Sequence, residues 1–342
     1  MKLIETRKAA GTVLCHDITQ IIRGVTKDAR FRKGHIVTEE DIPVLLSLGK
    51  DHLYVWEAGD DMLHENDAAE ILCRACKNDG MARSEVKEGK VELTAEHDGL
   101  FKVDKERLLK INSLGQMMIA SRHGNTPVKK GDKLAGTRII PLVIEKEKME
   151  PVKQIAKEGP ILSLLPYQPK KAAVITTGNE VYFGRIRDTF TPVIEEKLKE
   201  YGAEIAEHIV LPDDHKQVTR AILRALDNGA QMVLCTGGMS VDPDDQTPLA
   251  IKNTGAEIIS YGAPVLPGAM FLLAYYGEQR IPVMGLPGCV MYSKRTIFDL
   301  VLPRIMADDP VTAEELASLG EGGFCLGCEI CTYPNCGFGK GW

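Results

Sequence analysis

After Lys171 the sequence alternates regularly between short apolar runs and segments in which apolar residues have helical spacing. The apolar runs are strand candidates at residues 172–176, 205–211, 232–235, 257–260, 271–275 and 281–284. The helical segments are expected at 192–201, 218–227 and 248–252, and one long helix is expected at 289–306. Strands that alternate with helices form a mainly parallel sheet covered on both faces. We therefore predict a three-layer α/β/α domain at residues 166–308.

The residues before this domain have a different pattern. Residues 85–145 contain short apolar runs broken by turn sequences such as HDG at 97–99 and KGD at 130–132, which is typical of β structure. Prolines 160, 166 and 169 then mark a domain boundary. We predict a β-rich α+β region at 1–165, which could be discontinuous, and a cysteine-rich tail at 309–342.

Composition limits the class of protein. A length of 342 residues fits two or three domains, and the net charge of −6 at pH 7 argues against a broad basic face for nucleic acid. The longest apolar runs are too short to span a membrane. The first residues lack the apolar stretch of a secretory signal. We expect a cytoplasmic protein that binds neither nucleic acid nor membranes.

Three loops follow expected parallel strands and contain glycine beside polar side chains. They are TGNE at 177–180 with Asp188 beyond it, TGGMSVDPDDQT at 236–247, and GLPG at 285–288. Ligands of parallel α/β sheets bind at the carboxyl ends of the strands. Each loop alone is more simply interpreted as a turn, but three at one edge indicate a binding site.

The second loop has groups suited to an anion and a cation. The amides of Gly237 and Gly238, with the hydroxyls of Thr236 and Ser240, are suited to phosphate. Three carboxylates of the same loop could supply the oxygen ligands that Mg²⁺ prefers: Asp242, Asp244 and Asp245.

These runs resemble a known family. TTGNE at 176–180, Gly184 followed by Asp188 and Thr189, TGGMS at 236–240 followed by Asp245, and GLPG at 285–288 occur in the order found in the molybdopterin-binding domain of molybdenum-cofactor biosynthesis proteins. The segment 31–49 is similar to the one preceding that domain in the molybdenumtransferase branch. The resemblance spans about 135 residues, so it is more specific than any one motif.

The resemblance implies a pocket for molybdopterin and a reaction in which adenylylated molybdopterin and molybdate give molybdenum cofactor and AMP, with Mg²⁺. By the same resemblance, Asp188 and Asp245 would hold the metal and manage the pyrophosphate charge, and Glu180 would contact the pterin or orient the site. The implied binding residues are Thr177, Gly178, Asn179, Thr236, Gly237, Gly238, Ser240, Asp242, Pro287 and Gly288. The implied partners are a second copy of the chain and a molybdoenzyme or another cofactor-biosynthesis protein.

The sequence departs from the family pattern in the binding loops and elsewhere, and two alternatives therefore stay open. Phe190 stands where the family usually has Asn, and Cys289 with Val290 stands where it has Asn-Pro. One alternative is a carrier or sensor that binds molybdopterin or molybdenum cofactor without turnover. The other is a nucleotide pyrophosphatase related to the competence-damage-inducible family.

Nine cysteines are present, and four of them crowd into the tail. Their spacing is C-x2-C-x2-C-x4-C, formed by Cys325, Cys328, Cys331 and Cys336. The first two intervals match ferredoxin-type [4Fe–4S] binding and the last is one residue longer than usual, while a four-cysteine Zn²⁺ site is an equal alternative. A further interpretation is that these sulfurs handle molybdenum or sulfide.

The other cysteines carry weaker expectations. Cys73 and Cys76 are expected on one helix face as two small buried residues. Cys289 is expected at the start of the long helix, where the helix dipole would lower its pKa.

Overall fold

The computed structural model describes residues 2–22, 26–55, 61–240, 242 and 245–341. The chain divides into two compact units. The first consists of the described residues of Met1–Glu96, Val103–Arg122 and Gly131–Ser163, and the second of those of His97–Lys102, His123–Lys130 and Leu164–Trp342. No helix in the described ranges is long and apolar enough to cross a membrane.

The first unit is rich in antiparallel strands, as the sequence predicted. Three strand pairs are β1–β4, β2–β3 and β5–β12, and a four-stranded sheet has the order β6-β7-β11-β9. The strands are β1 (Lys2–Glu5), β2 (Ile18–Ile22), β3 (Thr26–Phe31), β4 (His52–Val55), β5 (Met62–His64), β6 (Met81–Arg83), β7 (Lys90–Ala95), β9 (Met117–Ser121), β11 (Lys133–Ile139) and β12 (Val143–Glu145). The α-helices are α1 (Asp41–Ser47), α2 (Glu65–Cys76), α3 (Lys105–Asn112) and α4 (Glu150–Ala156), with short 3-10 helices at Thr6–Lys8 and Lys146–Met149. Cys73 and Cys76 of α2 are buried, which confirms that prediction.

The second unit is built on a six-stranded sheet of order β15-β14-β16-β19-β18-β17. β15, β14, β16 and β19 are parallel, and β18 runs antiparallel to both β19 and β17. The bounds are β14 (Lys171–Thr177), β15 (Glu204–Leu211), β16 (Met232–Thr236), β17 (Glu257–Tyr261), β18 (Leu272–Tyr276) and β19 (Ile281–Leu286). The helices are α5 (Asn179–Tyr182), α6 (Phe190–Lys199), α7 (His215–Asp227), α8 (Thr247–Asn253), α9 (Ile297–Met306) and α10 (Ala313–Ser318). A separate three-stranded sheet has the order β10 (Thr126–Val128), β8 (Gly99–Val103), β13 (Leu162–Pro166).

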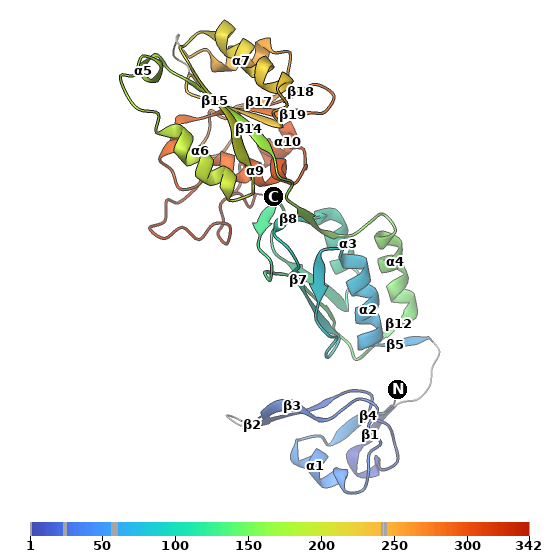
Figure 1. Ribbon diagram of the computed structural model, residues 1–342. Helices are drawn as coiled ribbons and strands as arrows, with labels where there is room; N and C mark the ends of the chain where they lie inside the picture. The colour runs from blue at the N-terminus through green and yellow to red at the C-terminus, as the bar shows by residue number, and fades with distance from the viewer. Residues whose placement is uncertain (1, 23–25, 56–60, 241, 243–244, 342) are drawn as a thin grey trace. The chain divides into compact units, whose positions relative to one another are not determined.

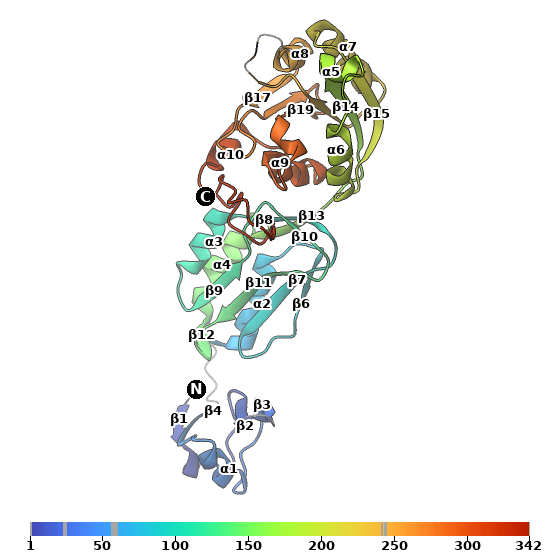
Figure 2. The same cartoon turned by 90° about the vertical axis from the view of Figure 1, so that its left-hand side faces the viewer.

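Helices cover both faces of the six-stranded sheet, which confirms the three-layer α/β/α prediction. α6 and α9 lie on one face, and α7 and α8 lie on the other (Figures 1 and 2). Alternate residues of β14 enter different cores, because successive strand side chains point to opposite faces. Val174 packs in the core of the first face and Ile175 in that of the second.

The prediction of one long helix at 289–306 is wrong. The structure has a short 3-10 helix η3 (Gly288–Met291), and α9 begins only at Ile297. The physical reason is a capping box: the Thr296 side chain accepts from the first-turn backbone, and the Asp299 carboxylate accepts from the Thr296 amide at 2.7 Å. Such a box fixes where a helix starts whatever the apolar pattern before it.

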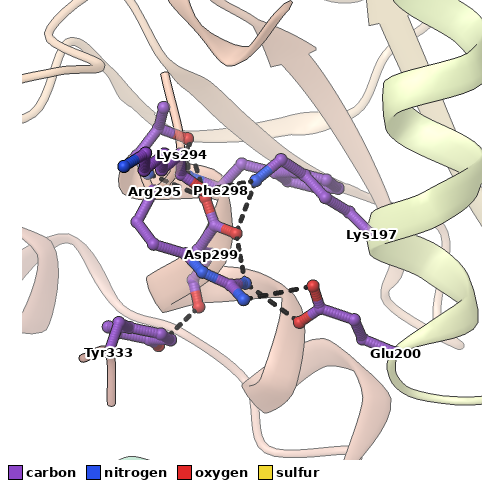
Figure 3. Close-up of polar contacts among 8 residues, drawn as sticks. Lys197, Glu200, Lys294, Arg295, Phe298, Asp299 and Tyr333 are labelled. Carbon is purple, nitrogen blue, oxygen red and sulfur yellow. Dashed lines mark hydrogen bonds and ion pairs between the residues drawn. The ribbon is translucent and has the colours of Figure 1, made fainter. Parts of the chain in front are cut away.

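The Asp299 carboxylate also pairs with two basic side chains, those of Lys197 and Arg295 (Figure 3). Its Oδ1 accepts from Lys197 Nζ at 2.7 Å and from the Arg295 guanidinium at 2.9 Å. The Asp299 side chain is 2% exposed and that of Lys197 is 9% exposed. Arg295 also pairs with the Glu200 carboxylate at 2.9 Å. One carboxylate therefore both caps α9 and neutralises charge from α6.

We predict that Asp299→Ala lowers the free energy of unfolding by about 3–5 kcal/mol, because it leaves the buried Lys197 ammonium without its carboxylate. Urea unfolding of the full chain measures the change. Glu195→Ala is the matched control, since Glu195 pairs with Lys199 at the surface and its removal should cost at most about 1 kcal/mol. Equal losses in the two variants would contradict the prediction.

Candidate functional site

Three neighbouring strands end at one edge of the sheet with their loops close together. Thr236 of β16 lies opposite Thr176 of β14 on one side and opposite Leu286 of β19 on the other. The Thr177 hydroxyl donates to the Thr236 carbonyl at 3.3 Å. Because ligands of parallel sheets bind at the carboxyl ends of the strands, this edge is the candidate binding edge.

The loop after β16 approaches its neighbours so closely that it requires glycine. A Cβ on Gly237, whose φ is +84°, would lie 2.2 Å from the Thr177 carbonyl oxygen. A Cβ on Gly238, whose φ is +56°, would lie 2.8 Å from the Thr247 hydroxyl. Thr247 closes the loop, since its hydroxyl donates to the Gly237 carbonyl at 2.9 Å. These glycines are therefore needed for packing as well as for access to the backbone.

The loops after β16 and β19 form a cavity of about 580 Å³, a size typical of small-molecule sites. Its lining is mainly apolar, and Asp245 is the one charged side chain among the described lining residues. Asp245 Oδ2 accepts from the Ser240 amide at 2.8 Å, which fixes the carboxylate against its own loop. The cavity is lined by Phe190, Gly237, Gly238, Met239, Ser240, Asp245, Ala269, Met270, Leu286, Pro287, Gly288, Cys289, Met291 and Tyr292.

Outside this cavity, a cluster of polar residues centred on Asp188 lies around the end of β14. Asp188 Oδ1 accepts from the amides of Phe190 and Thr191 at 2.8 and 3.1 Å, and its Oδ2 accepts from the Thr191 hydroxyl at 2.5 Å. His208 of β15 lies 3.3 Å from the same carboxylate and 3.0 Å from the Thr176 hydroxyl. Burial alone would raise the pKa of Asp188, but the hydrogen bonds from Thr191 and the Phe190 amide outweigh it and lower the pKa.

The structure brings some of the predicted site residues together. Gly237, Gly238, Ser240 and Asp245 line the cavity, joined by the third loop through Pro287 and Gly288. Seven other predicted residues are described but are not among its lining residues: Thr177, Gly178, Asn179, Glu180, Asp188, Thr236 and Asp242.

The first loop turns away into the short helix α5. The Asn179 amide donates to the Asp213 carboxylate at 3.0 Å, and Glu180 is exposed. The Glu180 carboxylate folds back over Gly178, where a Cβ would lie 2.9 Å from its Oε1. Glu180 therefore does not share the cavity of Asp245 and Gly288.

The two carboxylates predicted to share Mg²⁺ have different surroundings. Asp245 lines the cavity, whereas the oxygens of Asp188 already accept hydrogen bonds from Thr191, Phe190 and Thr176. Within the described ranges, no group of three or more His, Cys, Asp or Glu side chains is arranged to hold a metal ion. Asp244, the third acidic residue of that loop, lies outside the described residues.

Sequence reasoning missed several residues of this region. His208 and Thr191 join Asp188 from other elements, and the signal for His208 was a histidine next to Glu207 within a strand of mainly apolar residues. The expectation for Cys289 is wrong, because it lies in η3 rather than at the start of α9, and burial raises the pKa of its thiol. Cys289 does line the cavity, together with Met239 and Met291.

Comparison with known proteins finds two family matches in the chain. Residues 173–307 match the family described as a probable molybdopterin binding domain. Residues 3–57 match a family described only as a domain of unknown function. The first match covers the strands and loops that form the cavity.

Curated relatives are similar over part of the chain. A molybdopterin molybdenumtransferase from Synechococcus elongatus is 28% identical over 158 residues, which are 44% of this chain and 38% of that protein. A CinA-like protein from Mycobacterium avium is 37% identical over 91 residues, which are 26% of this chain and 21% of that protein. The matched part is thus less than half of either relative's length. A solved tungsten cofactor synthesizing protein MoaB from Pyrococcus furiosus is 24% identical, with a TM-score of 0.34 and coverage of 40% of this chain and 93% of that one.

We predict that Gly237→Ala destabilises the second unit more than Gly277→Ala. Both glycines have positive φ, +84° and +64°, but a Cβ on Gly277 meets nothing within 4 Å. Alanine costs about 1–2 kcal/mol at either position because of the backbone conformation, and the clash with Thr177 adds about 1–3 kcal/mol at Gly237. Urea unfolding of both variants measures the difference, and equal losses would show that the loops are not packed as described.

We also predict that acid destabilisation is weaker in Asp188→Asn than in the parent chain. A carboxyl whose pKa is lowered on folding contributes stability that is present above its unfolded value of about 3.9 and is lost as the pH falls through the folded value. Unfolding free energies measured between about pH 6 and pH 3 should therefore fall less steeply in the variant. An unchanged slope would mean that the Asp188 hydrogen bonds do not favour its charged form.

Proposed function

We propose that this protein, whose residues 173–307 belong to the molybdopterin-binding domain family, binds molybdopterin in the cavity at the carboxyl ends of β16 and β19 and acts in molybdenum cofactor biosynthesis. The observation that carries the proposal is the coincidence of the family match with the domain whose strand-end loops form that cavity. The family match supports the ligand class, and the cavity supports the proposed location.

The lining suits a flat heterocycle with a phosphate at one end. Met270 and Met291 provide apolar surface, and thioethers are adaptable partners for an aromatic ring. Gly237 and Gly238 bring backbone without side chains to the same cavity, which lets a ligand approach the main chain. An apolar wall with a few polar groups is the usual composition of a small-molecule site.

We further propose that the reaction is insertion of molybdate into adenylylated molybdopterin with release of AMP. The relative from Synechococcus elongatus is named a molybdopterin molybdenumtransferase. Reaction at a pyrophosphate depends on positioning and on neutralising negative charge. The described lining residues include no Lys or Arg, so the positive charge must come from elsewhere.

Mg²⁺ is the cation that we propose for this charge. Mg²⁺ is usually bound by one or two carboxylates together with substrate phosphates, and Asp245 is a carboxylate of this kind at the cavity. When bound, the ion would neutralise the phosphate oxygens. Asp245, held by the Ser240 amide, would orient the ion, while the apolar wall would hold the ring.

A specific observation favours a second candidate, a carrier or sensor that binds without turnover. Asp188 was expected to work beside Asp245, yet it is engaged by Thr191, Thr176 and His208 and does not line the cavity. A site with one carboxylate can still bind the pterin. Because part of the chain is similar to the CinA-like protein, the assay also tests nucleotide cleavage as a third candidate activity.

The test incubates the anaerobically purified full chain with adenylylated molybdopterin, molybdate and Mg²⁺, and measures AMP by chromatography. We expect AMP release that falls about 100-fold or more in Asp245→Asn. Pterin binding without AMP would support the carrier, and cleavage of free dinucleotides or ADP-ribose would support the pyrophosphatase. Absence of both binding and turnover would overturn the proposal.

A steric variant separates binding from folding in the same experiment. Gly288 lines the cavity, and a Cβ on it would meet nothing within 4 Å, so Gly288→Leu should fill the cavity without disturbing the fold. We expect loss of molybdopterin binding with unchanged unfolding. Gly320→Leu is the control, because its Cβ makes only ordinary contacts at 3.6 Å or more and it is not among the lining residues.

A further inference from the structure

The cysteine-rich tail has a cavity of its own, of about 410 Å³. All four of its cysteines line this cavity, and none of them is in a disulfide. Cys328 and Cys331 are exposed, while Cys325 and Cys336 are partly buried against the domain core. The fold therefore gathers around one space the four thiols that the sequence spaces closely: Cys325, Cys328, Cys331 and Cys336.

Both ends of the cysteine segment are fixed to the domain. At its start, the Cys325 amide donates to the Leu266 carbonyl and the Leu266 amide to the Gly323 carbonyl, each at 2.8 Å. At its end, Phe338 is 4% exposed in the core. Gly339 packs against Leu300 of α9 so closely that a Cβ would lie 2.3 Å from a Leu300 methyl carbon. The segment is thus a closed loop on the domain surface.

The middle of the segment is fixed by Tyr333 (Figure 3). Its hydroxyl donates to the Asp299 carbonyl at 2.9 Å. The Arg295 guanidinium lies 5.1 Å from the centre of the Tyr333 ring, a distance typical of a cation–π contact. The tail is therefore held by the charge network that stabilises the start of α9.

Positive charge lies beside the cysteines. Lys294 and Arg295 line the cavity, and Lys294 Nζ donates to the Glu329 carbonyl at 2.6 Å and to the Cys328 carbonyl at 3.4 Å. These cations would compensate the negative charge that four metal-bound thiolates bring together.

The spacing of the four cysteines favours a cluster over a single ion. Four-cysteine Zn²⁺ needs all four sulfurs at about 2.3 Å from one point. Within the described ranges no three possible ligands are arranged to hold a metal ion, although the four thiols line one cavity, so the spacing of the cysteines carries the choice of a cluster. A [4Fe–4S] cluster instead takes one thiolate at each of four separate irons, which suits ligands spread around a space. The C-x2-C-x2-C order is that of such clusters.

We propose that Cys325, Cys328, Cys331 and Cys336 bind a [4Fe–4S] cluster in the tail cavity. The proposal goes beyond the function proposed for the strand-end cavity and does not depend on it. Lys294 lines the same cavity, so its charge would act on the cluster.

The test purifies the full chain anaerobically, reconstitutes it with Fe²⁺ and sulfide, and measures bound iron, acid-labile sulfide and the electron paramagnetic resonance spectrum after reduction. We expect about four irons and four sulfides per chain. Cys328→Ser with Cys331→Ser, both at exposed positions, should abolish the cluster while circular dichroism stays unchanged. Cys73→Ala, a buried cysteine of α2, should retain the full cluster.

Three results would overturn the proposal: no iron retained by the parent chain, one Zn²⁺ bound per chain in place of iron, or full iron content in the double variant. Lys294→Gln gives a second readout, because removing a positive charge beside the cluster disfavours its reduced form. We expect an unchanged iron content and a reduction potential shifted to more negative values. Lys294→Arg should restore the potential, and a Lys294→Gln potential equal to that of the parent would mean that the cluster is not at this cavity.

Discussion

The in-register parallel pairing of β14, β16 and β19 is the constraint on which the candidate site depends. Ala172 and Val174 pack under α6 and α9, while Ala173 and Ile175 pack under α7 and α8. A slip of one residue would exchange these side chains between two differently shaped cores. Register is therefore set by packing along the whole strand. The strand ends, and hence the loops that follow them, meet at one edge as a consequence.

Two aspartates, Asp188 and Asp245, lie at this edge, and their surroundings give them different roles. Asp188 is held by Thr176, Thr191 and His208, so it connects β14, the start of α6 and β15. Asp245 accepts from the Ser240 amide and lines the cavity. A carboxylate whose oxygens are already hydrogen-bonded is stabilised as an anion but has little left to offer a ligand. Motif order alone does not separate these two roles.

The sequence predicted what local patterns control and missed what long-range contacts control. The buried strands, the helices between them and the loops at 236–247 and 285–288 follow from apolar periodicity and glycine placement. The meeting of Asp188 with His208 depends on β15 pairing beside β14, which no local pattern encodes. The false helix at 289–296 has another cause: apolar residues 289–292 precede those of α9, but residues 293–296 between them are polar and the Thr296–Asp299 capping box starts α9 at Ile297.

That late start of α9 has a structural consequence for both cavities. Gly288 and Tyr292 line the strand-end cavity, and Ser293 and Arg295 line the tail cavity. In one continuous helix from 289 to 306, side chains this close in sequence would spread around the axis every 3.6 residues. A short segment that leaves the helical path can instead face one cavity and then the other. Because Asp299 caps α9 at Thr296, the segment before the helix can line two cavities. The Asp299 carbonyl also accepts from Tyr333 of the tail.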